Sequence, residues 1–303
     1  MNKEIIKAEL KNIKFIKSTD YGNNEIYTFS AEESPILMKE VGRLREITFR
    51  AAGGGTGKEY DIDNFDISDN PFKQLIIWCP NSEQIIGGYR YKYGWEIEID
   101  DNGRINTPSG ELFSFSEEFH KTYTPYMIEL GRSFVIPEYQ ATGSARKGLA
   151  ALDNLWDGIG SIIVENIDRA KYFFGKFTMY RNFDTFSRDL ILRFLEYYFG
   201  NNEHLCHAIK PITREYSNQL LDSKFCLNSP EEDLKTLHTL LKIQEEMVPP
   251  LVNSYINLTK TLKYFGTTIN TTFGDVEESG ILLTIGDMEQ RKYERYVLNK
   301  MIR

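Results

Sequence analysis

The sequence contains few cysteines, and their spacing builds no scaffold. Cys79, Cys206 and Cys226 are odd in number and form no CxxC pair. Disulfide frameworks use even sets of cysteines in oxidising compartments, so this pattern favours a reducing compartment. We therefore expect a cytoplasmic protein.

Long apolar runs and an excess of basic residues are also missing. The net charge is −8, whereas nucleic-acid binding needs a concentrated basic surface, so DNA and RNA are not expected partners. No apolar stretch reaches the length of about 20 residues that a membrane-spanning helix needs. The composition, with 41% hydrophobic and 26% charged residues, is that of a globular protein.

The N-terminal segment is basic and amphipathic. Residues 1–17 place five lysines among apolar residues at Ile6, Leu10, Ile13 and Ile16. This pattern favours a surface helix or edge strand packed on the domain. A helix lying on a membrane surface is the alternative, so peripheral contact with the inner face of a membrane stays open.

Apolar periodicity predicts helices and strands that alternate along the chain. Helices are expected at residues 34–50, 149–163 and 185–199, and strands at 74–78, 84–91, 126–136 and 171–179. Helices at 230–247 and 252–265 and strands at 266–273 and 279–285 follow. This alternation is typical of an α/β fold, a central mixed sheet flanked by helices, with a C-terminal α+β extension packed on the same sheet.

Three segments partly match known functional motifs, but each lacks a feature that its motif requires. The glycine-rich stretch ending at Gly57-Lys58 lacks the first glycine of a phosphate loop, at Ala52, and its hydroxyl residue, at Glu59. The spacing of His204, Cys206 and His207 does not by itself assemble a tetrahedral metal site. Ser133 lacks the GxSxG context of hydrolases. We interpret the glycine-rich stretch as a lid that closes over a substrate and expect no metal.

Four segments with charged residues follow one another in a recognisable order. They are Arg45-x-x-x-Phe49, Asp61-x-Asp63-x-x-Asp66, Gly87-Gly88-Tyr89-Arg90 and Glu129-x-x-Arg132-Ser133-Phe134. Their order and spacing resemble the acyl-homoserine-lactone synthases of the GNAT acyltransferase superfamily. The chain is more similar still to the lipid-forming branch, the hemolysin-like N-acyltransferases of ornithine-lipid and glycine-lipid synthesis. That likeness lies in EVGRLREITFR, GTGKEYDIDNFD, ELGRSFVIPEYQ, ALDNLWDGIG, KYFFGKFTMY and FGTTINTTFGDVEESGILLTI.

The resemblance implies a GNAT-like fold and an acceptor site. In the related synthases, equivalent acidic residues and arginines form a network that places the amino-acid substrate. A guanidinium matches an acceptor carboxylate, and ionised carboxylates accept hydrogen bonds from its amine. The residues implied in substrate binding are Arg45, Phe49, Asp61, Asp63, Asp66, Arg90 and Arg132.

Glu129 is the candidate catalytic residue. A protonated amine cannot attack a thioester, so a general base must remove a proton, and Glu129 stands in a predicted central strand. A structural salt bridge to Arg45 or Arg132 is its alternative role. Strand alternation places Glu129 and Arg132 on opposite faces unless a bulge intervenes.

A candidate donor-binding segment follows the same strand. Gln140-x-x-Gly143-x-Ala145 resembles the pyrophosphate-binding loop of GNAT enzymes, where N–H groups at a helix N-terminus bind phosphate oxygens. Arg146 and Lys147 come next. These two residues either bind the donor's phosphates or bind the acidic surface of a carrier protein. The alternative is that they are solvated charges at the start of a helix. The donor implied is acyl-ACP or acyl-CoA, with no permanently bound cofactor.

The resemblance leads to one functional expectation. We expect an acyltransferase core at residues 1–205 and, in one compact unit with it, an extension at 206–303 that completes the substrate pocket. The expected activity moves a long 3-hydroxyacyl chain from acyl carrier protein to the α-amine of glycine, ornithine or another small amino acid. Gly55 stands where lactone synthases carry tryptophan, which disfavours lactone formation. An acetyl-CoA-dependent acetyltransferase and a non-catalytic, membrane-active protein are the alternatives.

Overall fold

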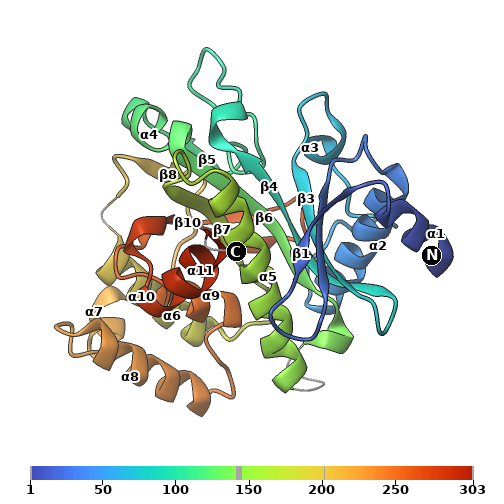
Figure 1. The fold of residues 1–303 in the computed structure, drawn as a ribbon. Coiled ribbons are helices and arrows are strands. Elements are labelled where there is room, and N and C mark those ends of the chain that lie inside the picture. The colour runs from blue at the N-terminus through green and yellow to red at the C-terminus, as the bar shows by residue number, and fades with distance from the viewer. Residues whose placement is uncertain (1, 141–144, 201, 302–303) are drawn as a thin grey trace. The chain divides into compact units, whose positions relative to one another are not determined.

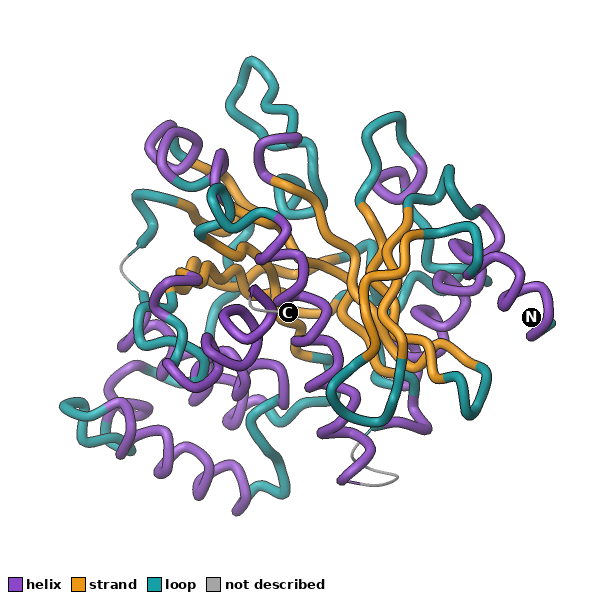
Figure 2. The backbone as a smooth tube through the Cα atoms, viewed as in Figure 1, coloured by secondary structure: helices purple, strands orange, loops and turns teal. Residues whose placement is uncertain are grey.

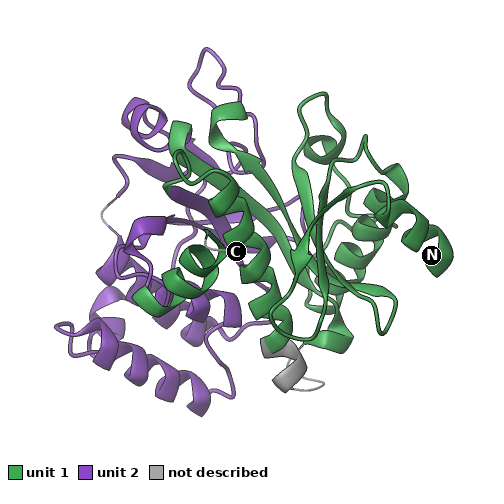
Figure 3. Ribbon diagram, viewed as in Figure 1, with its two compact units in different colours: residues 1–97, 125–171, 290–303 green, residues 98–124, 172–289 purple. Residues whose placement is uncertain are grey.

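The chain folds into two compact units that interleave along the sequence. The computed structural model describes residues 2–140, 145–200 and 202–301, and of residues 145–149 it describes the backbone alone. Unit 1 contains residues 1–97, 125–171 and 290–303, and unit 2 contains residues 98–124 and 172–289 (Figure 3). Residue 205 falls inside unit 2, and the functional division into a core and an extension at that point stays a prediction.

Unit 1 is built on five antiparallel strands, drawn in orange in Figure 2. In spatial order they are β1 (Lys14–Ser18), β2 (Glu25–Phe29), β3 (Lys73–Cys79), β4 (Gln84–Tyr93) and β6 (Met127–Val135). Strands β3 and β4, which pair as an antiparallel hairpin, confirm the strands expected at residues 74–78 and 84–91. The strand expected at residues 126–136 is β6.

Two long helices cover opposite faces of this sheet. Helix α2 (Pro35–Ala51) begins as the sequence predicts, with Ser34 as N-cap and proline in its first turn. Its Arg45 bonds Gln74 of β3, whereas Gly158 of α5 (Ala145–Glu165) lies against Leu75. Successive residues of a strand point to opposite faces, so α2 and α5 (Figure 1) enclose the sheet between them.

Short elements complete unit 1. Helix α1 (Lys3–Leu10) buries Ile6 and Leu10, and Ser34 bonds Glu9, so its apolar face packs on the domain. The remaining elements are α3 (Asn64–Ile67), η1 (Gly94–Glu96), η3 (Pro137–Tyr139), α10 (Gln290–Tyr293), the π-helix η5 (Glu294–Leu298) and α11 (Asn299–Met301).

The C-terminal segment docks on α5. A Cβ at Gly160 would lie 2.0 Å from the carbonyl oxygen of Tyr296, so only glycine permits this approach. Arg295 and the Tyr296 hydroxyl bond Asp153, and Lys300 pairs with Asp157. Burial, opposed by the charge of Asp157, lowers the pKa of Lys300 to about 8. Residues 290–301 are therefore an integral layer of unit 1.

Unit 2 contains three consecutive antiparallel strands. Strand β10 (Val276–Thr284) lies between β7 (Tyr172–Met179) and β9 (Lys263–Asn270), so strands of the C-terminal extension pair with a strand that precedes residue 205. A smaller sheet pairs β5 (Phe113–Phe115) with β8 (Cys206–Ala208). Phe174 packs against the rings of Phe115, Phe119 and Phe265 in the core.

The other elements of unit 2 are helical. They are α4 (Glu117–Thr122), α6 (Thr185–Phe199), α7 (Asn218–Asp222), α8 (Pro230–Ile243), α9 (Pro250–Ile256) and η4 (Ile285–Asp287), while η2 (Thr124–Tyr126) crosses the boundary of the units. Helix α6 confirms the range predicted. The helix expected at residues 252–265 was wrong in its second half, because α9 ends at Ile256 and β9 begins at Lys263. The apolar residues there continue in a strand paired with β10.

Candidate active site

The acidic loop after the glycine-rich stretch forms a helix cap. Asp63 is the N-cap of α3, and its side chain accepts a hydrogen bond from the Phe65 N–H at 3.0 Å. The Asp66 side chain reaches back to the Asp63 N–H at 3.2 Å, which completes a capping box. The spacing Asp63-x-x-Asp66 thus holds both carboxylates in fixed positions above the sheet.

Asp66 is the centre of a buried ion network. It is fully buried and bonds Nη1 of Arg45 at 3.2 Å, Nη1 of Arg90 at 3.1 Å and Nε2 of Gln74 at 3.0 Å. Arg45 also donates to the Gln74 side chain. Helix α2, strand β3 and strand β4 are therefore joined through one carboxylate.

Charge pairing outweighs burial at Asp66 and Arg90, whereas burial prevails at Arg45 and lowers its pKa. Burial alone would raise the pKa of Asp66, but the guanidinium groups of Arg90 and Arg45 hold it well below its usual range. Burial likewise opposes ionisation of Arg90, yet Asp66 and Asp63 raise its pKa. The lowered pKa of Asp66 and the raised pKa of Arg90 both favour the charged forms of this pair.

A β-bulge brings Arg132 to the same face. Arg90 lies opposite Gly131 and Gly88 opposite Phe134, so Arg132 and Ser133 together oppose the single residue between. Arg132 has φ +50°, in the left-handed region that non-glycine residues rarely occupy. Its Nε donates to Asp61 at 2.8 Å, and its Nη2 lies 3.6 Å from Asp63, which also pairs with Arg90. The bulge therefore breaks the strand alternation and places Arg132 on the face of β6 that carries Glu129.

The network differs in exposure from its centre to its edge. The side chains of Arg45, Asp61 and Asp66 are fully buried, whereas that of Arg132 is 14% exposed and that of Asp63 is 31% exposed. Three arginines face three aspartates, so the group is neutral as it stands. The buried members brace the loop on the sheet, and substrate can meet the network at Arg132 and Asp63 without breaking its centre.

Glu129 lies on the network's face of β6. It is opposite Lys92 in the ladder, and Gly131, two residues on, is opposite Arg90, so the four positions share one face. Glu129 is only 2% exposed. Lys92 donates to the carbonyl of Asn70, and its ammonium lies over the Phe72 ring. The structure brings Glu129 and the network together on one surface of the sheet.

Three further residues lie beside the arginine–aspartate network, and only Phe49 among them was predicted from the sequence. Phe49 lies one turn after Arg45 on α2 and is buried. The missed residues are Gln74, which fills the space between Arg45 and Asp66, and Phe72, whose ring centre lies 5.1 Å from the Arg90 guanidinium. A lone glutamine in the apolar run QLIIWC was the available signal for Gln74.

In the candidate donor-binding segment, the structure describes Gln140 with its side chain and residues 145–147 by their backbone alone. The Gln140 side chain donates to the Val135 carbonyl at 2.7 Å, which ties the end of β6 to the residues that follow. Gly143 lies outside the described residues. Ala145, Arg146 and Lys147 begin α5, and their side chains also lie outside what the structure describes. Their role in binding the donor stays a prediction.

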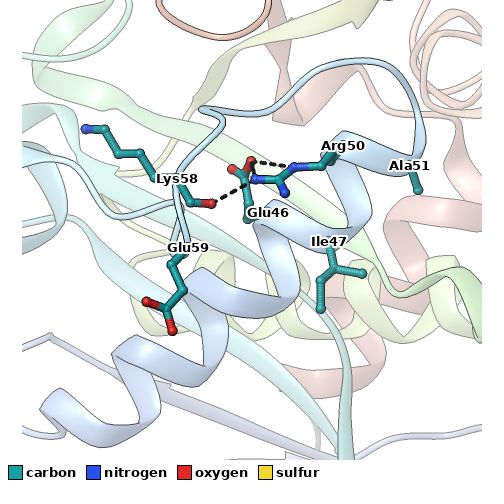
Figure 4. A pocket seen from close by; sticks show the side chains of 6 residues that line it. All are labelled: Glu46, Ile47, Arg50, Ala51, Lys58 and Glu59. Carbon is teal, nitrogen blue, oxygen red and sulfur yellow. Dashed lines mark hydrogen bonds and ion pairs between the residues drawn. The ribbon is translucent and has the colours of Figure 1, made fainter.

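Glu46 holds the glycine-rich loop against α2. Its buried carboxylate accepts hydrogen bonds from the N–H groups of Thr56 and Gly57, both at 2.9 Å, and pairs with Arg50 (Figure 4). Gly55 has φ +94°, and a Cβ there would lie 3.0 Å from this carboxylate. A larger residue there would strain the left-handed backbone and displace the Glu46 carboxylate, and the role of the stretch as a lid stays a prediction.

A surface pocket of about 470 Å³ lies beside this loop. It is lined by Glu46, Ile47, Arg50, Ala51, Lys58 and Glu59 (Figure 4). Its lining includes no member of the arginine–aspartate network, so we do not assign the chemistry to it.

The residues that the structure describes contain neither a metal-site cluster nor a membrane-spanning helix. Within residues 2–140, 145–200 and 202–301, no group of three or more His, Cys, Asp or Glu side chains has the arrangement of a metal site. No helix in the same ranges combines the length and the apolar character that crossing a bilayer requires.

Known proteins are similar to this chain over nearly its whole length. Residues 44–149, which include the network and Glu129, match the acetyltransferase (GNAT) domain. A glycine N(alpha)-acyltransferase of Phocaeicola vulgatus is 48% identical over 297 residues, which cover 98% of this chain and 91% of that protein. The chain belongs to this family of GNAT N-acyltransferases. A second glycine N(alpha)-acyltransferase, from Bacteroides thetaiotaomicron, is 46% identical over 297 residues, or 98% of this chain and 88% of the relative.

Membership of this family confirms the expected enzyme class and fold. The protein is an N-acyltransferase, which needs an acyl donor and an amine acceptor, and the predicted GNAT-like α/β fold is confirmed. A non-catalytic protein is excluded. Among solved structures, the crystal structure of the AHL synthase LasI is 20% identical with a TM-score of 0.34, covering 52% of this chain and 73% of that one. Nothing further rests on that likeness.

Proposed function

We propose that this N-acyltransferase moves a long, 3-hydroxylated acyl chain from acyl carrier protein to the α-amine of glycine. The observation that carries the acceptor is the identity of 48% and 46% to two relatives named as glycine N(alpha)-acyltransferases, over nearly their whole length. Ornithine, the other expected acceptor, has no such support. The carrier protein and the chain type rest on the resemblance to the lipid-forming branch.

In the proposed reaction, the amine nitrogen attacks the thioester carbonyl carbon. Glu129 accepts a proton from the acceptor's ammonium group, directly or through water, and the resulting amine forms the C–N bond. The C–S bond then breaks, the donor leaves as a thiol after taking up a proton, and an N-acyl amino acid is released. Glu129 supports this role by its burial on β6, on the face that the arginine–aspartate network fixes.

The network's proposed role is to position β6. Its centre is internally neutral and tied to α2, β3 and β4, and Arg132 at the bulge is held by Asp61 and Asp63. These contacts fix the backbone between Glu129 and the start of the donor segment. Contact of Arg132 or Asp63 with a substrate is part of the proposal, because they form the exposed edge.

The proposal is tested with purified enzyme, a panel of donors and two acceptors. Acyl-ACP and acyl-CoA of long and two-carbon chains are offered with glycine or ornithine, and products are measured by mass spectrometry. We expect N-acylglycine from long-chain acyl-ACP as the main product. Faster transfer of acetyl from acetyl-CoA, or of long chains to ornithine, would contradict the donor or the acceptor assignment respectively.

Glu129→Gln tests the base. This near-isosteric change should lower kcat by about 100-fold or more, the usual size of general-base effects, and leave the KM of both substrates nearly unchanged. Glu32→Gln, a change of an exposed residue in the loop before α2, is the matched control and should keep full activity. Wild-type kcat in the Glu129 variant would remove it from the mechanism.

A further inference from the structure

A short segment of unit 1 leads from strand β6 toward helix α5. It leaves β6 after Val135, forms the single turn η3 and reaches Gln140, the first residue of the candidate donor-binding segment. The Ile136 N–H donates to the Ile86 carbonyl at 3.0 Å, which continues the pairing of β6 with β4. The hydrogen bonds within η3, and the bond from Gln140 to Val135, are local. Longer-range contacts must therefore set the direction in which this segment runs.

Tyr139 supplies such a contact, because its hydroxyl reaches the turn between β3 and β4. It donates to Oγ of Ser82 at 3.0 Å, across 57 residues of sequence, and lies 3.8 Å from Sγ of Cys79. Burial opposes ionisation of the Cys79 thiol, but hydrogen bonds from Ser82, Tyr139 and Asn81 lower its pKa. The hydroxyl groups of Tyr139 and Ser82 thus meet the buried thiol at one polar centre.

The β3–β4 turn has anchors of its own. Glu83 has φ +55°, in the left-handed region that non-glycine residues rarely occupy. Lys3 of helix α1 donates to the Ser82 carbonyl at 3.0 Å. Lys7 of the same helix pairs with Glu83. Tyr139 is therefore tied to a turn that α1 holds in place.

We infer that Tyr139 is a positioning residue for the acyl donor: its hydrogen bond to Ser82 holds the end of η3, and with it Gln140, in the arrangement that binds the donor. A segment that visits several arrangements binds its ligand more weakly, because only the competent fraction can bind. A tether that raises this fraction lowers the KM for the donor and does not touch the reacting atoms. The inference rests on the proposed function, since it concerns the donor of the same reaction.

Kinetics of two variants test this inference. Tyr139→Phe and Ser82→Ala each remove one side of the hydrogen bond. Each should raise the KM for long-chain acyl-ACP about fivefold, which corresponds to about 1 kcal/mol for one neutral hydrogen bond. The kcat and the KM for glycine should stay within twofold of wild type. Ser82→Ala tests the same bond if Tyr139→Phe does not fold.

A matched control removes a tyrosine hydroxyl elsewhere in unit 1. Tyr27→Phe loses a 2.8 Å hydrogen bond to Glu25 and should keep the wild-type KM for the donor. An unchanged donor KM in folded Tyr139→Phe would overturn the inference. So would equal rises in the KM for the donor and the KM for glycine, since a merely structural role would weaken both.

The double variant distinguishes one shared bond from two independent effects. Because Tyr139→Phe and Ser82→Ala remove the same hydrogen bond, the two changes together should raise the donor KM by no more than either alone, about fivefold. A rise of about 25-fold, the product of two independent effects, would contradict a shared tether.

Donor binding without turnover keeps this inference separate from the proposed function. Calorimetric titration with long-chain acyl-ACP, in the absence of glycine, should give a Kd about fivefold higher for Tyr139→Phe than for wild type. If wild type binds this donor but acylates no glycine, the proposed acceptor fails, and the ratio of the Kd values still tests the tether. Equal Kd values in the two proteins, or no binding by wild type, would overturn the inference.

Discussion

At the scale of the residue, Asp66 is the group on which the site depends most. It accepts hydrogen bonds from Arg45, Arg90 and Gln74 in a place without solvent. Removing one partner of a buried pair is costly because the remaining charge is left uncompensated. The stability of the arginine–aspartate network therefore rests on one carboxylate.

Asp66→Asn should destabilise the protein by about 3–5 kcal/mol, the range measured for broken buried pairs. The reason is that Arg45 and Arg90 remain charged and buried with less compensation. Chemical denaturation measures the change. Asp69→Asn, an exposed residue three positions on, should change stability by less than about 0.5 kcal/mol. Equal effects of the two changes would mean that the network is not stabilising.

The pH dependence of stability follows from the same residue. The pKa of Asp66 is lowered in the folded protein, and its unfolded value is about 3.9. The contribution of the ionised carboxylate is therefore complete above pH ~4 and is lost as the pH falls from there toward the lower folded-state pKa. The stability difference between wild type and Asp66→Asn should shrink as the pH is lowered below about 4. A difference that stays constant to pH 2.5 would contradict this pairing.

At the scale of the element, the bulge in β6 and the helix α5 shape unit 1. The bulge turns Arg132 toward Asp61 and Asp63, and α5 carries glycines where other parts of the chain approach closely. Gly158 makes room for Leu75, and Gly160 for the C-terminal segment. The stretch ALDNLWDGIG thus has a packing role.

Gly160→Ala tests the docking of the C-terminal segment. Alanine is favoured over glycine in a helix by about 1 kcal/mol, so without a clash the change would stabilise the protein. Because the new Cβ would meet the Tyr296 carbonyl at 2.0 Å, we expect a loss of about 1–3 kcal/mol instead, measured by thermal unfolding. Gly286→Ala, where a Cβ meets nothing within 4 Å, is the control and should be nearly neutral. A stabilised Gly160→Ala protein would show that the segment does not dock as described.

Local patterns predicted most elements, and the exceptions have physical causes. Helix α2 has a serine cap and proline, and α6 has clear helical periodicity, so both were predicted well. Strand β9 was taken partly for a helix because a short apolar run does not separate the two states. Strand alternation predicted that Glu129 and Arg132 would share a face only if a bulge intervened. The sequence could not show where the bulge lies, because the left-handed conformation of Arg132 is held by tertiary partners.

The residues of the candidate site could be predicted from the sequence. Which of them are buried and brace the loop, and which are exposed, could not. Order and spacing brought Arg45, Asp66, Arg90 and Arg132 together, and the structure joins them in one network. Burial, which the sequence does not show, separates the bracing centre from the exposed edge.

At the scale of the whole molecule, the residues assigned to the chemistry lie in unit 1, which carries Glu129, the network and the start of α5, whereas unit 2 contains residues 98–124 and 172–289. The family assignment covers both, because the relatives align with 98% of the chain. The likeness to these relatives therefore extends over the C-terminal extension, beyond the GNAT match at residues 44–149.

The most direct test of the central claim is mass spectrometry of lipids from a host that expresses the intact protein, beside hosts that express Glu129→Gln or nothing. The account predicts long-chain N-acylglycine with the intact protein and little or none in the other two extracts. Three matching extracts, with the intact protein folded and a 3-hydroxyacyl donor supplied, would contradict it.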